Sequence, residues 1–459
     1  MIIFSKKVHL LLFIIFVSSI LFSKIILSNN FFYIIFFIIL VSYIFLMLYF
    51  HNSKNIEFYI FIPFLISTVQ NIYLGMNINY ITGIELKLLL SLHMLLLYSL
   101  FFNYYILFPI KNKYYFNFFK YMLLLLIVHS LVLFIFKGAN TMAFLASLRN
   151  IMSPFVFFML GYIVSNKINI NNYFKLVIYL GYFIIFFGLL ELFIIQDLWL
   201  SLNISDLWLK KDLNIQEHGF PGNFYGKESG EYVRRMVSTF ADPVNLGTAM
   251  FMILMISWLK KYYFLMFLSF ISVILIISKG ALLGILIFIW IYIKNKFHIL
   301  FSYISAVILI SLGLAFVYIS FLNNSMSLFL HFSGFISSLT ELPNNLLGRG
   351  VGNIGVLATQ LSKVTFETGI TESGLGLIIG QLGIIGLLIY LLFFSSLLKH
   401  TKFIEDIRIK IFLQTTILSI FFNIIFNEVA LSPNSSGIYF TIFGIFFASK
   451  KINKIQGKT

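Results

Sequence analysis

The sequence predicts an all-α polytopic membrane protein with about 14 transmembrane helices and two long loops on its outer side. Its composition is 60% hydrophobic and 10% charged, with 57 phenylalanines in 459 residues, which excludes an ordinary soluble domain. Apolar runs of roughly 17–25 residues, the length of a helix that crosses a bilayer, recur along the chain. Cysteine is absent, so disulfides and thiolate metal sites are excluded.

The expected spans follow from these apolar runs. The first run follows Lys6 and Lys7, but it is too long for a signal peptide and has no small-residue cleavage site, so it is expected to be an uncleaved span. Two of the runs are short, so the number of spans is approximate. The runs lie near residues 8–27, 31–50, 56–74, 84–108, 119–136, 148–165, 173–195, 243–258, 262–277, 281–293, 298–320, 374–397, 411–427 and 436–449.

The basic residues predict the orientation of these spans. If the N-terminus is cytoplasmic, 20 of the 32 lysines and arginines fall on inner loops, as the positive-inside rule requires. The net charge of +16 then reflects topology, and the scatter of the lysines argues against nucleic-acid binding. Both termini are expected to be cytoplasmic. The chain divides into helical segments 1–195, 241–320 and 374–459 and periplasmic loops 196–240 and 321–373.

The first long loop mixes tryptophan and leucine with a Pro-Gly-Asn turn, so it is expected to fold as a small cap of short amphipathic helices and turns. Long loops at the mouth of a membrane protein commonly enclose a site. The two outer loops are therefore the expected place for chemistry.

Arginine is rare in this chain, and its placement is informative. A planar guanidinium can hold a phosphate with two parallel hydrogen bonds, whereas an ammonium group acts as a point charge. The outer arginines are therefore candidate phosphate ligands, and the alternative for each is an ion pair with an Asp or Glu side chain. Four of the five arginines fall on the predicted outer side, where basic residues are disfavoured: Arg149, Arg234, Arg235 and Arg349.

Two further outer segments carry candidate phosphate-binding groups. Lys279 lies in a tight hairpin between two spans, where the alternative is that it reaches the lipid headgroups. Glycines 348, 350 and 352 surround Arg349, and they would let the backbone approach an anion closely. The alternative for these glycines is a turn that needs positive φ angles.

Other polar residues near the spans have simpler expected roles. His129 lies in mid-span sequence and is expected to be packed or hydrogen-bonded. Glu191 and Glu428 lie near outer boundaries, where each could pair with an arginine or reach interfacial water. No metal-binding or Gly-x-Ser-x-Gly motif occurs, so neither a metal, a cofactor nor a serine hydrolase site is expected.

Several short motifs, taken in order, resemble the O-antigen polymerase and ligase superfamily. The resemblance covers roughly residues 230–400, and the remainder matches only in hydropathy and loop placement. The motifs are RMVSTFADPVNLG at 235–247, SKGA at 278–281, GRGVG at 348–352, ESGL at 372–375 and QLGIIGL at 381–387.

This resemblance implies a GT-C-like glycosyltransferase in the cytoplasmic membrane of a Gram-negative bacterium. Such proteins act at the periplasmic face on glycans carried by undecaprenyl pyrophosphate. A polymerase of the Wzy type moves the growing chain onto a new lipid-linked repeat unit, and a chain-length regulator protein is its expected partner. Family ligases usually have a histidine where this chain has residues 371–373, which favours a polymerase, while Lys279 stands where arginine is common.

The chemistry of such a transfer assigns roles to the outer residues. Fixed cations would stabilise the leaving pyrophosphate without a metal or cofactor. Glu372, Asp242 or His331 could accept the proton of the acceptor hydroxyl, and Glu372 is favoured because it occupies the position of the ligase histidine. Its ionisation is expected to be favoured by the dipole of the following helix, and the alternative is that it only caps that helix. A ligase, a flippase for lipid-linked glycans and a non-catalytic scaffold are the other functions considered.

Overall fold

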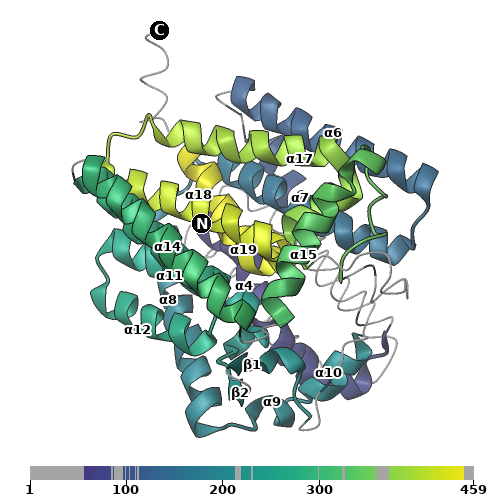
Figure 1. The fold of residues 1–459 in the computed structure, drawn as a ribbon, viewed down its shortest axis with the longest axis vertical. Coiled ribbons are helices and arrows are strands. Elements are labelled where there is room, and N and C mark those ends of the chain that lie inside the picture. Colours follow the sequence, from purple (N-terminus) through teal and green to yellow (C-terminus); the bar gives the residue numbers. More distant parts are fainter. Residues whose placement is uncertain are drawn as a thin grey trace, which may run out of the picture.

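The computed structural model describes residues 56–83, 86, 97–98, 100–102, 104–108, 110, 113–211, 215, 219–228, 231–297, 299–322, 326–356, 358 and 372–448. The expected spans at 8–27 and 31–50, and most of the span at 84–108, lie outside the described residues. Helices dominate the described chain (Figure 1). The long helices are α4 (Ile56–Asn77), α6 (Lys113–Lys137), α7 (Thr141–Val164), α8 (Ile170–Leu189), α11 (Pro243–Lys260), α12 (Tyr263–Ile276), α13 (Lys279–Lys296), α14 (Ile299–Leu322), α15 (Met326–Thr340), α17 (Gly374–Thr401), α18 (Ile407–Phe426) and α19 (Pro433–Phe447).

The structure agrees with an all-α polytopic membrane protein. Among the described residues, seven helices are long and apolar enough to cross a membrane. They coincide with expected spans, and α12, at 14 residues, is short as its apolar run indicated. The seven are Ile56–Tyr80, Lys113–Lys137, Thr141–Val164, Ile170–Ile194, Pro243–Lys260, Gly374–Thr401 and Ile407–Phe426.

Local sequence signals set where several helices begin. The Asp242 side chain accepts the backbone N–H groups of the first turn of α11, and Pro243 occupies the first helical position, where its missing N–H costs nothing. Ser432 and Pro433 start α19 in the same way. Because each cap is encoded within three residues, these helix starts follow directly from the sequence.

The first long loop folds as a cap, here defined as residues 195–240, which lies at the lower edge of the view in Figure 1. Its core is aromatic, with Trp199 and Phe224 fully buried and Tyr73 of α4 packed against them. The cap contains short helices as expected, but it also contains an antiparallel hairpin that an all-α prediction omits. Its elements are α9 (Leu198–Ser201), α10 (Ile204–Lys210), a 3-10 turn (Gly222–Phe224), β1 (Tyr225–Glu228), β2 (Glu231–Arg234) and a 3-10 turn (Ser238–Phe240).

Close helix packing and phenylalanine rings form the main core. A Cβ atom at Gly161 of α7 would lie 2.1 Å from the carbonyl oxygen of Thr441 in α19, so only glycine permits this approach. Phe158 packs edge-on against Phe393 and Phe447, with ring centroids 5.5 Å apart in both pairs. The high phenylalanine content is thus used in helix packing.

Several helix ends meet at the end of the bundle that carries the cap. The backbone N–H of Met236 donates to the carbonyl of Leu275 at the end of α12 (3.0 Å). The backbone N–H of Glu428, just after α18, donates to the carbonyl of Glu372, just before α17 (2.7 Å). Each of these two hydrogen bonds joins residues that were expected on the same side of the membrane.

Candidate functional site

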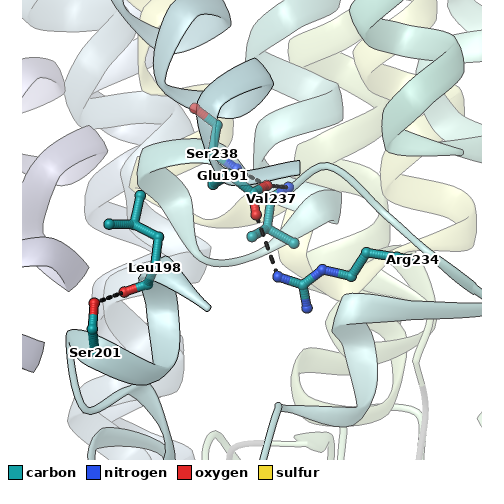
Figure 2. A network of polar contacts seen from close by, with 6 residues as sticks. All are labelled: Glu191, Leu198, Ser201, Arg234, Val237 and Ser238. Atoms are coloured by element: carbon teal, nitrogen blue, oxygen red, sulfur yellow. Dashed lines mark hydrogen bonds and ion pairs between the residues drawn. The ribbon is translucent and has the colours of Figure 1, made fainter. Parts of the chain in front are cut away.

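Arg234 and Glu191 form the best-defined polar contact of the cap (Figure 2). Glu191 lies on a π-helical turn (Leu190–Ile194) that continues α8, and its side chain is fully buried. One carboxylate oxygen lies 3.3 Å from Nη2 of Arg234 at the end of β2. The other accepts the backbone N–H groups of Val237 (2.7 Å) and Ser238 (3.2 Å). Of the two alternatives for Glu191, a pair with an arginine or contact with interfacial water, the structure shows the pair with Arg234.

Aromatic rings enclose the guanidinium of Arg234. Its central carbon lies 4.2 Å from the ring centroid of Phe220, 4.7 Å from that of Phe224 and 5.5 Å from that of Tyr225. These distances allow cation–π attraction, which is stronger where water is excluded. Nη1 is buried and has no hydrogen-bond partner within the described residues. Among the described residues, Arg234 therefore keeps one strong donor without an acceptor.

Arg235 has a different environment although it is the next residue. Its guanidinium donates to the carbonyl oxygens of Ile276 (2.9 Å), Ile277 (3.3 Å) and Asn223 (3.4 Å). The first two carbonyls lie at the C-terminal end of α12, where a cation is favoured by the helix dipole. These contacts give Arg235 a structural role that joins the cap to the α12–α13 turn.

Asp242 is held by hydrogen bonds within its own segment. Besides the backbone N–H groups of Val244 and Asn245, it accepts the side-chain amides of Asn245 and Asn223. Burial raises the pKa of the Asp242 carboxyl, and these donors together with nearby Arg235 oppose that increase. Because its oxygens are engaged by these donors, the contacts favour a capping role over proton transfer.

Lys211 is a neighbour of Asp242 that sequence analysis did not select. Its ammonium donates to the side-chain oxygen of Asn71 on α4 (3.0 Å) and lies 4.8 Å from the ring of Trp208. Burial lowers its pKa to about 8, although the Asp242 charge acts in the opposite direction. Its run Lys210-Lys211 after an apolar segment resembles an ordinary solvated pair, so the sequence contained no signal for this burial.

The glycines around Arg349 form turns rather than an open anion-binding loop. Gly348, Gly350 and Gly352 have φ angles of +93°, +101° and +86°. A Cβ atom at Gly348 would lie 2.3 Å from the carbonyl oxygen of Gln381, and one at Gly352 would lie 2.6 Å from the backbone nitrogen of Phe144. The described contacts therefore support the alternative of turns with positive φ, packed closely between α7 and α17.

The Arg349 loop fills a break in α17. Gly383 interrupts the helix with φ 63° and ψ −150°, a conformation that is essentially restricted to glycine. The carbonyls of Gly380 and Gln381 instead accept the N–H groups of Arg349 (2.8 Å) and Gly350 (3.1 Å). The N–H of Ile384 donates in turn to Leu346 (2.9 Å). The loop thus satisfies backbone groups that the break in α17 leaves open.

His129 of α6 contacts both the Arg349 loop and α17. Its Nε2 lies 3.1 Å from the carbonyl oxygens of both Leu347 and Leu382. His129 therefore links the loop to the residue just before the break. This agrees with the expectation that His129 is packed or hydrogen-bonded. The sequence did not identify these two partners, which are 218 and 253 residues away.

Alanine at Gly383, in the break of α17, should destabilise the protein more than alanine at Gly138, which lies outside it. Gly138→Ala is expected to lower the free energy of unfolding by about 1 kcal/mol, because Gly138 has a positive φ but open space around its Cβ position. Gly383→Ala should cost at least twice as much, because its Cβ would also lie 2.1 Å from the carbonyl oxygen of Leu346. Thermal unfolding of the purified variants in detergent measures both effects, and equal losses would contradict the assigned contact.

The remaining basic candidates lie apart from Arg234. Arg349 forms an ion pair with Glu341, and both side chains are partly exposed. Arg149 lies on α7, where its Nε donates to the Asn150 side chain (3.1 Å). Lys279 is the first residue of α13 and is exposed, as expected for the tight turn between α12 and α13.

The acidic candidate Glu372 does not cap α17. The neighbouring Ser373 does so, because its hydroxyl accepts the N–H of Gly376 (2.9 Å). Burial raises the pKa of the Glu372 carboxyl, which opposes the ionised form that the helix dipole is expected to favour. Glu428 is buried beside it, and one of its carboxylate oxygens accepts the N–H of Val356 (3.0 Å). His331 lies on α15, within the segment expected to be a loop.

The site therefore has a compact part and a dispersed part. Arg234 and Arg235 are neighbours in the cap, and Asn223 contacts both Arg235 and Asp242. The other candidates lie on other elements: Arg349, Arg149, Lys279 and Glu372. The described residues contain no group of three or more His, Cys, Asp or Glu side chains suited to a metal ion. No protein-family model matches the sequence, and no curated protein matches it.

Proposed function

We propose that this protein is a membrane glycosyltransferase that polymerises oligosaccharide repeat units carried by undecaprenyl pyrophosphate. The observation that carries the proposal is the guanidinium of Arg234, which is fixed by Glu191 and three aromatic rings and retains a buried donor. A donor of this kind suits an anionic oxygen, and the cap places it beside apolar helices that suit a lipid tail. The O-antigen polymerase-like motifs at 235–247 and 278–281 surround this region.

In the proposed reaction, a hydroxyl of the acceptor sugar attacks the anomeric carbon of the growing chain. The bond between that carbon and the pyrophosphate oxygen breaks, and the lipid pyrophosphate leaves with additional negative charge. Arg234 stabilises that charge, and Glu372 accepts the proton of the attacking hydroxyl. Glu372 is preferred because it occupies the position of the histidine in the ligases that this chain resembles, whereas Asp242 caps α11.

The proposal extends to place and partners. The enzyme would lie in the bacterial cytoplasmic membrane with about 14 spans and a GT-C-like arrangement, its cap would face the periplasm, and a chain-length regulator would bind it. Its substrates would be lipid-linked glycans within the membrane, and it would need neither a metal nor another cofactor.

Reconstitution with purified substrate tests this function. The protein in nanodiscs, supplied with undecaprenyl-pyrophosphate repeat units isolated from its native membrane, should form lipid-linked oligomers and release one undecaprenyl pyrophosphate per bond. Transfer to lipid A–core alone would identify a ligase. Movement of intact lipid-linked units across proteoliposomes without new glycosidic bonds would identify a transporter, a function that the broken helix α17 also fits.

A further inference from the structure

We propose that Glu191 is a positioning residue that aims Nη1 of Arg234 at a diphosphate oxygen of the substrate. This inference rests on the proposed function, because it takes the ligand to be a pyrophosphate. The sequence leaves open whether Glu191 pairs with an arginine or contacts water. The structure adds the partners that define how it would act.

The two carboxylate oxygens of Glu191 have separate tasks. Oε1 accepts the N–H groups of Val237 and Ser238 and so holds the turn that leads into α11. Oε2 pairs with Nη2 of Arg234. A buried carboxylate is stable only when such partners satisfy it, so the arginine and the turn are fixed relative to one another.

The π-helical turn at the end of α8 is what presents Glu191 to these partners. π-Helical turns are rare in proteins, and many of those that occur lie at functional sites. A regular α-helix would rotate successive side chains by about 100°, so the change in winding at Leu190–Ile194 alters the direction of Glu191. The hydroxyl of Ser238 also donates to the carbonyl of Ile184 on α8 (2.6 Å), which ties the turn to the same helix.

These contacts leave the guanidinium of Arg234 little rotational freedom. The central carbon of the group lies 4.2 Å and 4.7 Å from the ring centroids of Phe220 and Phe224. Nη2 points to Glu191 (Figure 2). Because the guanidinium is planar, the direction of Nη1 is then determined. A buried donor without a partner is costly in a protein interior, and an anionic oxygen of the substrate would remove that cost.

The substitution Glu191→Gln separates the two tasks of the carboxylate. The glutamine oxygen can still accept from Val237 and Ser238, but the neutral amide no longer attracts Arg234. We expect affinity for inorganic pyrophosphate, measured by calorimetry on the purified protein, to fall at least tenfold. We expect polymerisation to fall by about 100-fold, the effect of misplacing a reacting group by roughly 1 Å.

Glu57→Gln is the matched control. Glu57 is also a buried carboxylate near an end of α8, and it accepts the backbone N–H of Asn169 (2.6 Å). Its variant should keep wild-type pyrophosphate affinity, so a general effect of removing a buried charge can be recognised. Arg234→Lys should weaken pyrophosphate binding as Glu191→Gln does, and the double variant should be no weaker than Arg234→Lys alone.

The outcomes distinguish this inference from the proposed function. Wild-type pyrophosphate affinity in Glu191→Gln would overturn the inference, as would a wild-type protein that does not bind pyrophosphate. Weakened pyrophosphate binding in both variants, together with no polymerisation by the wild type, would support the positioning role and reject the polymerase. If Glu191→Gln does not fold, Glu191→Asp replaces it, because aspartate keeps the charge but is one methylene shorter. Wild-type pyrophosphate affinity in Glu191→Asp would likewise overturn the inference.

Discussion

Arg234→Lys is expected to lower polymerisation by about 10²–10³-fold, the usual effect of removing one fixed donor to a developing negative charge. Lysine keeps the positive charge, but its ammonium group is a single point of charge. It therefore cannot pair with Glu191 and also donate to a pyrophosphate oxygen in a second fixed direction. Initial rates of oligomer formation by the purified variant measure the effect. Polymer length on gels of cell-surface glycan provides the corresponding measurement in vivo.

Arg235→Lys is the control for this prediction. The guanidinium of Arg235 donates to three backbone carbonyls, so its loss should lower the thermal unfolding midpoint and the amount of protein in the membrane. The rate per folded molecule should stay within about threefold of the wild type, because surface and structural contacts act mainly through stability. Equal losses of rate per folded molecule in both variants would contradict the roles assigned here.

The contrast between these neighbours shows the limit of sequence reasoning at the site. The sequence left two interpretations for each outer arginine, a phosphate ligand or an ion pair with an Asp or Glu side chain. The structure places Arg234 at the end of a strand, where it pairs with Glu191, and the next residue, Arg235, donates to three backbone carbonyls. The ion pair was therefore among the alternatives, but the carbonyl contacts of Arg235 were not.

The parts of the fold that follow from the sequence are those encoded locally. Apolar length predicts the seven membrane-length helices, and three-residue signals such as Asp242-Pro243 and Ser432-Pro433 predict where helices begin. The break at Gly383 was not predicted, because one glycine in an apolar run has many explanations. It became clear only from the carbonyl of Leu346, which accepts the N–H of Ile384.

Contacts between distant segments account for most of what the sequence did not reveal. Lys211 lies 140 residues from Asn71, and Glu191 lies 43 residues from Arg234. Without structural contacts, an isolated lysine or glutamate in an apolar protein fits headgroup contact as well as a buried ion pair. Local rules therefore found Arg234 and Glu191 but not which arginine Glu191 pairs with, and they did not find Lys211.

Glu372→Gln is expected to lower the rate of polymerisation by about 10²-fold or more, the range for loss of a general base. Ser373 rather than Glu372 caps α17, so the substitution leaves the start of the helix intact. The same variant should be at least as stable as the wild type at neutral pH. Burial raises the pKa of Glu372, so its ionised form is disfavoured in the folded protein and glutamine removes that cost.

The stability and the activity of the Glu372→Gln variant should each differ from the wild type in a way that depends on pH. Because the folded-state pKa of Glu372 is raised, its contribution to stability is fully present below the unfolded-state pKa and is lost as the pH rises through the folded-state pKa. The thermal midpoint of Glu372→Gln should therefore exceed that of the wild type at neutral pH, and the difference should shrink in acid.

A general base must be ionised, so wild-type kcat/KM should fall as the pH decreases through the same raised pKa of Glu372. This fall at acid pH should be absent from the profile of the variant. Glu57→Gln, which removes a buried carboxylate elsewhere, should retain the wild-type profile. Normal polymer ladders from Glu372→Gln, with its acid limb unchanged, would assign proton transfer to another residue.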